Sequence, residues 1–396
     1  MDDESDMSDH EIYGEQVGLN TPLLDESGPG SKQDANFAHM IASVEQAIAE
    51  DILPEMILQG SSGSYFCRNT SNEIVGVFKP KNEEPYGHLN PKWGKWIQKH
   101  FCCWCYGRDC LPQNQGYLSE AGASLVDQAL GLNIVPKTKV VRLVSSSFHY
   151  SRFDRARARA VQSASRRFPE TVGKHLRQGL PPKIGSFQVF VRGFKDASEV
   201  LRSLNFDELQ PETQDSLTRQ FQHMVVLDYL TRNTDRGNDN WLLRFTPADE
   251  DGNGESIQLA AIDNGLSFPK KHPDNWRAYP YYWAWLYLAR FRFRDDIVEK
   301  LLPQLRDETF IEGLCERLYL LFKQDYGFSR SVFEKKKALN LTKALEQRLS
   351  PAELVRLPPI TVELSRRRRR GSSTSSEGAS RYTQVVADRR PFFQWI

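Results

Sequence analysis

Residues 232–242 read RNTDRGNDNWL and form a polar loop between two apolar segments. A helix is predicted just before the loop, over residues 215–232, because apolar residues recur along it at the spacing of one helical face. An apolar, strand-like run follows. Asp235 and Asn240 stand five residues apart in the loop. We therefore expect the helix and the strand to hold these two polar side chains close together.

A second part of the pattern follows this loop. Residues 260–265 read AAIDNG, a strand-like apolar run that ends in Asp263. Phosphoryl transfer uses a loop Asp that accepts the hydroxyl proton, an Asn five residues later that binds metal, and a second Asp after a strand. We therefore expect Asp235 to act as proton acceptor, and Asn240 and Asp263 to bind Mg²⁺, with Mn²⁺ as the alternative metal.

A small-residue turn and a lysine upstream meet the other needs of phosphoryl transfer. Residues 59–64 read QGSSGS, and the strand IVGVFK that follows ends in Lys79. Backbone N–H groups of such a turn can approach phosphate closely, although a plain β-hairpin has the same composition. Lys79 has the position of a lysine that pairs with the phosphates of ATP, and equally that of a solvated strand end. Glu120, on a helix predicted over residues 115–130, is a candidate partner of Lys79.

The composition is that of an ordinary globular protein without a global charge. The 396 residues include 52 basic and 51 acidic side chains, so we expect no nucleic-acid partner. No apolar run reaches the roughly 18 residues that span a bilayer. The first residues, MDDESDMSDHE, lack the basic and apolar regions of a signal peptide. We therefore expect a chain that faces the cytosol and reaches membranes through local patches.

Apolar periodicity divides the chain into two lobes with irregular ends. Residues 1–36 are acidic and are predicted to be disordered. Residues 37–185 are expected to form a small mixed lobe around the hairpin, with a surface insertion at about 152–183 that holds nine basic and two acidic residues. Residues 186–362 are expected to form a mainly helical lobe, and residues 363–396 a basic low-complexity tail. The predicted class is α+β, a two-lobed kinase-like fold.

Several longer stretches resemble type II phosphatidylinositol 4-kinases, members of the phosphatidylinositol 3- and 4-kinase superfamily. Besides the loop at 232–242, they are QGSSGSYF (59–66), VFKPKNEEPYG (77–87), NQGYLSEAGAS (114–124), AIDNG (261–265), HPDNWRAYP (272–280) and the terminal PFFQW. The resemblance implies a two-lobed kinase that transfers the γ-phosphate of ATP to the 4-hydroxyl of phosphatidylinositol. The product would be phosphatidylinositol 4-phosphate on cytosolic membrane faces.

The resemblance also implies roles for individual residues. Lys79 would contact the phosphates, Asp235 would lie at the catalytic centre, and Asp263 would bind metal or nucleotide. The residues that would surround the nucleotide are Leu58, Ser61 and Ser64 on the loop side and Gln188, Val189, Phe190 and Val191 at a hinge that holds adenine. Those near the lipid headgroup would be Glu84, Pro85 and Tyr86.

Membrane attachment is a further implication of the resemblance. Type II members carry a palmitoylated Cys-Cys-Pro-Cys-Cys cluster, and the similar segment here, within a Cys-rich stretch at about 92–110, is the altered sequence FCCWC. Cys102, Cys103 and Cys105 are the expected acylation sites, and two or three chains would be needed because one chain binds only marginally. A zinc site is the alternative, but the segment lacks a second Cys or His pair at ligand spacing.

Aromatic residues are expected to add membrane contacts. Trp93 and Trp96 stand near the cysteines, and Trp276, Trp283 and Trp285 precede a group of arginines. Aromatic residues alone more often form a core, whereas aromatic and basic residues together are typical of a membrane interface. The resemblance implies the cytosolic face of the Golgi, trans-Golgi network, endosomes or plasma membrane, with phosphatidylinositol and clathrin-adaptor-type trafficking proteins as partners.

Two other functions compete with this interpretation. A protein kinase would carry the words HRD and DFG, which are absent here. A catalytically weak membrane scaffold that recruits trafficking adaptors would be favoured by loss of Lys79, Asp235 or Asp263, and all three are present. The sequence therefore favours an active lipid kinase, with the scaffold as the alternative.

Overall fold

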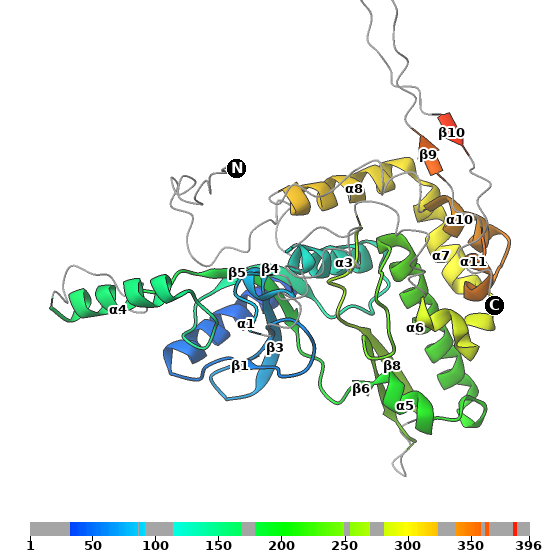
Figure 1. Ribbon diagram of the computed structural model, residues 1–396. Coiled ribbons are helices and arrows are strands. Elements are labelled where there is room, and N and C mark those ends of the chain that lie inside the picture. The colour runs from blue at the N-terminus through cyan, green and yellow to red at the C-terminus, as the bar shows by residue number, and fades with distance from the viewer. Residues whose placement is uncertain are drawn as a thin grey trace, which may run out of the picture.

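The chain folds into two lobes, one built on a five-stranded sheet and one mainly helical (Figure 1). The computed structural model describes residues 32–85, 87–91, 114–167, 179–248, 254–269, 281–323, 338–357, 361–363 and 383–385. Every strand pair within the described residues is antiparallel, and helices pack beside the sheets. The predicted α+β class is confirmed.

The smaller lobe is an antiparallel sheet with the strand order β1-β2-β3-β5-β4. Its strands are β1 (Glu55–Met56), β2 (Tyr65–Arg68), β3 (Ile74–Pro80), β4 (Thr138–Leu143) and β5 (Lys183–Val189), and helix α1 (Lys32–Ala49) packs against them. Side chains on one face, Tyr65, Phe78 and Phe187, form a core with Phe37 of α1, as the alternation of side chains along a strand requires. The predicted hairpin of β2 and β3 is confirmed.

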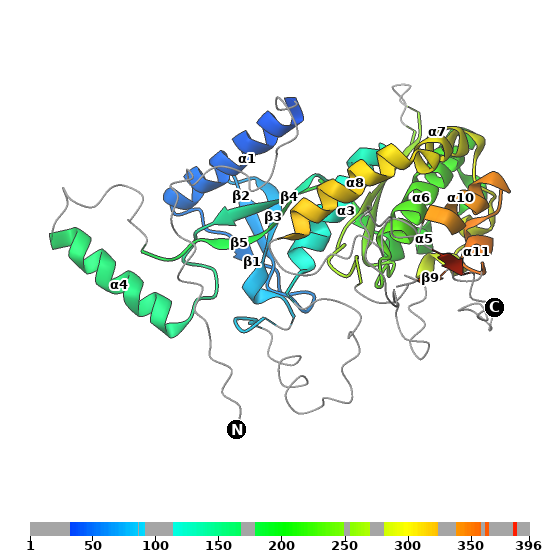
Figure 2. The same cartoon turned by 90° about the horizontal axis from the view of Figure 1, so that it is seen from above.

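Three boundaries in this lobe differ from the prediction. Helix α1 begins at Lys32, inside the segment predicted to be disordered, because Asp34 forms ion pairs with two lysines next to and within β4. The sheet continues to Val189, so the lobe boundary predicted at residue 185 falls inside β5. The basic insertion contains a helix, α4 (Arg152–Arg167), which projects away from the lobe (Figures 1 and 2). Lys183, the last residue of the predicted insertion, is instead the first residue of β5 and is buried.

Helix α3 (Gly116–Leu130) lies between the two lobes, beside the small sheet and the helices of the larger lobe (Figure 2). Leu118, Val126 and Leu130 belong to the core of the larger lobe. The helix ends at Gly131, whose φ of 63° is the left-handed conformation that glycine adopts without strain. Both lobes therefore fix the orientation of α3.

The larger lobe combines a helical bundle with a three-stranded antiparallel sheet in the order β6-β7-β8. The strands are β6 (Lys195–Asp196), β7 (Trp241–Thr246) and β8 (Ser256–Ala261). The helices are α5 (Ala197–Ser203), α6 (Pro211–Thr231), α7 (Asp295–Arg306), α8 (Glu308–Phe322), α10 (Ala338–Glu346) and α11 (Pro351–Leu354), with 3₁₀ turns η4 (Phe206–Glu208), η5 (Tyr282–Trp285) and η6 (Tyr287–Arg290). The buried helix α6 packs against β8. It ends at Thr231, so the polar loop begins directly after it.

The segment predicted to be a low-complexity tail contributes one strand. β9 (Thr361–Glu363) pairs with β10 (Thr383–Val385) in a separate two-stranded sheet, whereas the arginine run lies outside the described residues. Within the part of the chain that the structure describes, no helix is both long and apolar enough to cross a bilayer.

Candidate active site

Lys79, near the end of β3, connects the two lobes through two carboxylates. Its Nζ lies 3.0 Å from Oδ1 of Asp263, just after β8, and also contacts Oε1 of Glu120 on α3. Glu120 is buried, and its other oxygen accepts the backbone N–H of Asn264 at 3.0 Å. Strand β3, helix α3 and the end of β8 therefore meet at one charged cluster.

The charges in this cluster stabilise one another. Burial alone would lower the pKa of Lys79, but the carboxylates of Asp263 and Glu120 outweigh burial and raise that pKa. The Lys79 ammonium in turn lowers the pKa of Asp263. For Glu120, burial dominates and raises the pKa, while Lys79 acts in the opposite direction. Lys79 thus stays a cation and Asp263 an anion, the forms needed to bind phosphate and metal.

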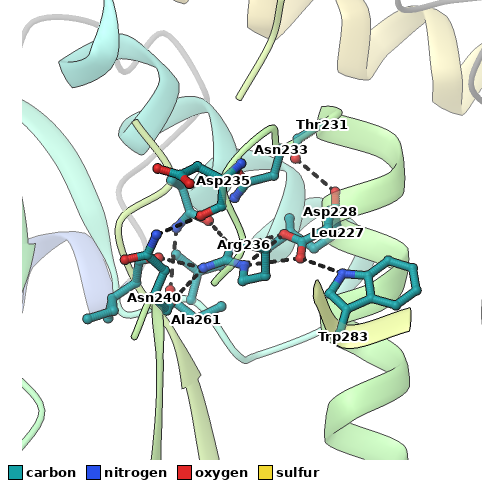
Figure 3. A network of polar contacts seen from close by, with 12 residues as sticks. Leu227, Asp228, Thr231, Asn233, Asp235, Arg236, Asn240, Ala261 and Trp283 are labelled. Carbon is teal, nitrogen blue, oxygen red and sulfur yellow. Dashed lines mark hydrogen bonds and ion pairs between the residues drawn. The ribbon is translucent and has the colours of Figure 1, made fainter. Parts of the chain in front are cut away.

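The polar loop after α6 places Asp235 and Asn240 next to the Asp263 segment. The Nδ2 of Asn240 donates to the backbone carbonyl of Asp235 at 2.6 Å, and the backbone carbonyl of Asn240 accepts the N–H of Ile262 at 3.1 Å. The carboxylate of Asp235 points away from the guanidinium of Arg236 (Figure 3). Both Asp235 and Asn240 line the cavity between the lobes.

A buried arginine fixes this loop to its surroundings (Figure 3). Arg236 is 1% exposed, and its guanidinium contacts both carboxylate oxygens of Asp228 on α6 at 3.0 to 3.1 Å. It also donates to the carbonyl of Ile262 at 2.5 Å, to the carbonyl of Asn240 and to the side chain of Asn264. The sequence analysis missed this residue, because an arginine among Asn, Asp and Gly resembles a solvated loop residue. The only feature of the sequence that could have indicated a structural role for Arg236 was its position directly after Asp235.

The Gly/Ser turn is hydrogen-bonded to the buried residue Glu83. Glu83, in the 3₁₀ turn η1 (Lys81–Glu83), accepts the N–H of Gly63 on its backbone carbonyl at 2.8 Å. Its carboxylate accepts from the Tyr65 hydroxyl and the Lys183 ammonium, each at 2.6 Å. A Cβ atom on Gly63 would lie 2.6 Å from this carboxylate, so the close approach requires glycine.

A cavity of about 700 Å³ between the lobes brings most of the predicted site residues together. Its lining includes Ser61, Ser64, Lys79, Glu84, Pro85, Gln188, Val189, Phe190, Val191, Asp235, Asn240 and Asp263. The volume lies in the range of cofactor and small-molecule sites. Glu120, only a candidate partner in the sequence, lines the same cavity.

The remaining nucleotide and lipid residues fall outside this cavity or outside the described structure. The side chain of Leu58 is 80% exposed and does not line the cavity, whereas its neighbours Ile57 and Gln59 do. Successive side chains in an extended segment point in opposite directions, so Leu58 lies beside the cavity and its nucleotide contact stays a prediction. The predicted residues outside the described part are Tyr86, Trp93, Trp96, Cys102, Cys103, Cys105 and Trp276.

Trp283 is a core residue, so its predicted role as a membrane contact is wrong. It is fully buried, its indole N–H donates to Asp228 at 3.1 Å, and its ring stacks on Tyr281 with centroids 4.7 Å apart. The 3₁₀ turn η5 explains the difference, because residues three apart lie on one side of such a turn. Tyr282 and Trp285 share the outer side, each 48% exposed.

The oxygen atoms in the site suit a hard divalent cation. Because Nδ2 of Asn240 donates to a backbone carbonyl, the amide oxygen is the atom that remains for a ligand. The carboxylate of Asp263 is 57% exposed and held ionised by Lys79. Among the described residues, no group of three His, Cys, Asp or Glu side chains is arranged to hold a metal. A site with the two oxygen-bearing side chains of Asn240 and Asp263 fits Mg²⁺, which is typically bound by one or two protein groups together with substrate phosphates.

One cavity is lined by a lysine–glutamate pair, a Gly/Ser turn, a loop aspartate, and the side chains of Asn240 and Asp263. This combination defines a phosphotransferase of the kinase class. The chain belongs to the phosphatidylinositol 3- and 4-kinase family, whose model matches residues 60–344. Members of this family use ATP and a divalent metal ion.

The relatives narrow the family to its type 2 branch. The chain is 51% identical to phosphatidylinositol 4-kinase type 2-alpha of Danio rerio, over 94% of this chain and 88% of that protein. It is 49% identical to phosphatidylinositol 4-kinase type 2-beta of Xenopus tropicalis, over 91% of this chain and 77% of that protein. Among solved structures, that of hydra Fam20 with sugar has a TM-score of 0.44 at 12% identity, covering 84% of this chain and 92% of the other.

Proposed function

We propose that this chain is a phosphatidylinositol 4-kinase, which transfers the γ-phosphate of ATP to the 4-hydroxyl of phosphatidylinositol and forms phosphatidylinositol 4-phosphate on cytosolic membrane faces. The observation that carries the proposal is the meeting of Lys79, Asp235 and Asp263 in one cavity, in a chain of this family. Phosphoryl transfer depends mainly on positioning and charge neutralisation, and these residues supply both.

In the proposed complex, the nucleotide lies between the five-stranded sheet and the segment that contains Asp263. Adenine lies against residues 188–191. The N–H groups of Val189 and Phe190 already donate to the carbonyls of Lys137 and Val75, each at 2.9 Å, so adenine uses the remaining backbone groups there. Ser61, Ser64 and the turn between them lie over the phosphates, and Lys79 neutralises part of their charge.

The transfer step assigns Asp235 to the acceptor hydroxyl. The hydroxyl oxygen forms a bond to the γ-phosphorus, the bond from that phosphorus to the bridging β–γ oxygen breaks, and ADP leaves. The hydroxyl proton moves to the Asp235 carboxylate. Asn240 and Asp263 would hold Mg²⁺, or Mn²⁺ as the alternative, which would supply positive charge at the phosphates. Of the three residues expected near the lipid headgroup, Pro85 and Tyr86 are the proposed contacts.

Membrane attachment combines acyl chains with surface contacts. Cys102, Cys103 and Cys105 are the proposed acylation sites, with Trp93, Trp96 and Trp276 as proposed neighbours at the interface. Trp285 is supported by its exposed position next to Tyr282. Helix α4 adds six arginines against one aspartate, a charge suited to anionic lipid. Golgi, trans-Golgi, endosomal and plasma membranes remain the proposed locations, and clathrin-adaptor-type proteins the proposed partners.

A catalytically weak scaffold is the competing function. Such a protein has no need to keep Lys79, Glu120 and Asp263 in one charged cluster. The cluster spans three elements from both lobes, so the enzyme is the function that the geometry supports best.

Labelled ATP, Mg²⁺ and phosphatidylinositol vesicles test the proposal directly. We expect labelled lipid from the wild type and a loss of at least about a hundredfold after Asp263→Ala or Lys79→Met, since each removes a charge at the phosphates. Glu312→Gln, at an exposed position of α8, is the matched control and should keep full activity. No labelled lipid from the wild type, or undiminished labelling from Asp263→Ala, would contradict the proposal.

Membrane anchoring has its own test. Protein purified from cells should be released from membranes by hydroxylamine, which cleaves thioesters. Changing Cys102, Cys103 and Cys105 together to serine should abolish this hydroxylamine-sensitive pool. If the pool persists in the triple variant, these cysteines are not the acylation sites.

A further inference from the structure

Helix α3 is capped by a carboxylate from a different segment. The residue before the helix, Gln115, makes no side-chain capping bond to it. Instead, Glu84, just after η1, accepts the N–H of Gly116 at 3.1 Å and the N–H of Tyr117 at 2.8 Å, one on each carboxylate oxygen. The first N–H groups of a helix have no partner within the helix, and a carboxylate there is stabilised by the helix dipole.

This cap and the lysine pair connect the same strand and helix. Glu84 stands five residues after Lys79 of β3, and Gly116 stands four residues before Glu120 of α3. Glu120 contacts Lys79, so strand and helix are joined both at the helix terminus and one turn further on. A shift of the α3 terminus would therefore change the position of Glu120 relative to Lys79.

The surroundings of Glu84 restrict it to this position. Its backbone carbonyl accepts from Nδ2 of Asn90 at 2.9 Å, and the same Nδ2 donates to the carbonyl of Ser61 in the Gly/Ser turn at 3.0 Å. A Cβ atom on Gly116 would lie 3.2 Å from the Glu84 carboxyl group, tighter than most real contacts. Glu84 is thus held through Asn90 to the Gly/Ser turn on one side and by the N-terminus of α3 on the other.

We propose that Glu84 is a positioning residue for phosphoryl transfer, which holds the N-terminus of α3 against the end of β3 and thereby sets Glu120 against Lys79. This inference rests on the proposed kinase function. It gives Glu84 a role different from the lipid contact that the sequence resemblance implies, because both of its carboxylate oxygens are engaged by backbone N–H groups.

The charge on Glu84 gives the proposal a second observable. Burial raises the pKa of Glu84 to about 7, opposed by the N–H groups of Tyr117 and Gly116 and by Lys81, while Glu120 adds to the rise. The ionised form interacts better with the positive end of α3. The cap should therefore weaken as pH falls below about 7, and nucleotide affinity should weaken with it.

The test compares Glu84→Gln with the wild type in three measurements. Affinity for Mg²⁺ and a fluorescent ATP analogue, measured without lipid, should fall at least about fivefold, and kcat at least about tenfold, with little change in KM for phosphatidylinositol. The weakening of nucleotide binding below about pH 7 should be present in the wild type and absent in the variant. Glu50→Gln, an exposed acid at the end of α1, should match the wild type.

A double variant decides whether Glu84 acts through Glu120. In the Glu120→Gln background, Glu84→Gln should lower nucleotide affinity less than twofold, since the contact it sets is already lost. Full additivity, or a rise in KM for phosphatidylinositol with unchanged nucleotide affinity, would overturn the proposal. Because binding is measured without lipid, its result stands even if the chain fails to phosphorylate phosphatidylinositol. If Glu84→Gln does not fold, Glu84→Asp, which withdraws the carboxylate by one methylene, is measured in the same way with the same expected directions.

Discussion

The Nζ of Lys79 lies 3.0 Å from Oδ1 of Asp263, although the two residues stand 184 positions apart. Glu120, on α3, contacts the same Nζ with one carboxylate oxygen. Its other oxygen accepts the backbone N–H of Asn264, the residue after Asp263. Glu120 therefore joins Lys79, the proposed phosphate-binding residue, to the segment that is proposed to bind metal.

Glu120→Gln should lower kcat by roughly a hundredfold while the fold is kept, because a neutral amide cannot hold the Lys79 ammonium in place. Steady-state kinetics with ATP and phosphatidylinositol vesicles measure this, and a thermal unfolding curve checks the fold. Activity within about threefold of the wild type would mean that Lys79 does not need this partner.

Arg236→Met should destabilise the protein by about 3 to 5 kcal/mol, because it leaves the buried carboxylate of Asp228 without its counter-ion. Urea unfolding measures the loss. The double variant Asp228→Asn with Arg236→Met should be more stable than Arg236→Met alone. Arg306→Met, which removes a guanidinium that is 59% exposed and paired with Glu346, should cost less than about 1 kcal/mol.

Gly63→Ala should raise the KM for ATP, because its Cβ would lie 2.6 Å from the buried Glu83 carboxylate and displace the Gly/Ser turn. We expect about a tenfold increase, corresponding to roughly 1.4 kcal/mol. Gly254→Ala is the matched control, since nothing lies within 4 Å of its added Cβ. Equal KM values for both variants would show that the turn tolerates a side chain at residue 63.

Two tryptophans in one 3₁₀ turn should behave in opposite ways. Trp283→Ala should cost about 3 to 5 kcal/mol of unfolding free energy, because the buried ring leaves a cavity and Asp228 loses a donor. Trp285→Ala should leave stability nearly unchanged and weaken binding to phosphatidylinositol vesicles in a flotation assay. The assignment of the two faces fails if Trp283→Ala is as stable as the wild type.

His223 should make the protein less stable in acid. Burial lowers the pKa of His223 to about 4, and its Nδ1 lies 2.9 Å from the carbonyl oxygen of Leu132. The unfolded chain therefore binds this proton first, so stability is complete above pH 6.5 and is lost as pH falls toward 4. Wild type minus His223→Gln should show a loss on the order of 3 kcal/mol across this window. His39→Gln, at an exposed position, should reproduce the wild-type curve.

Local patterns were sufficient to predict the elements that carry the site. The helix before Asp235, the hairpin before Lys79 and the strand before Asp263 all occur near their predicted bounds. Each depends on apolar periodicity and turn residues over a short stretch, which sequence displays directly. The order of these elements also predicted that their polar residues would meet.

Long-range contacts were the part that the sequence did not reveal. Arg236 is buried because Asp228, Asn264 and two carbonyls surround it, and none of these contacts is visible in the loop itself. Trp283 and Trp285 differ in burial only through the 3₁₀ geometry of η5. Helix α1 starts early because lysines beside and in β4, about a hundred residues away, pair with Asp34. Propensity alone cannot supply such tertiary information.

The position of the transferred phosphate tests the central proposal most directly. Wild-type protein is incubated with labelled ATP, Mg²⁺ and phosphatidylinositol vesicles, the labelled lipid is deacylated, and the headgroup is separated beside standards of the 3-, 4- and 5-phosphates. We predict a single labelled product at the 4-phosphate, absent with Asp235→Asn, because Asp235 is the proposed acceptor of the proton from the attacking hydroxyl. Label at the 3- or 5-position, or no labelled lipid, would contradict the account.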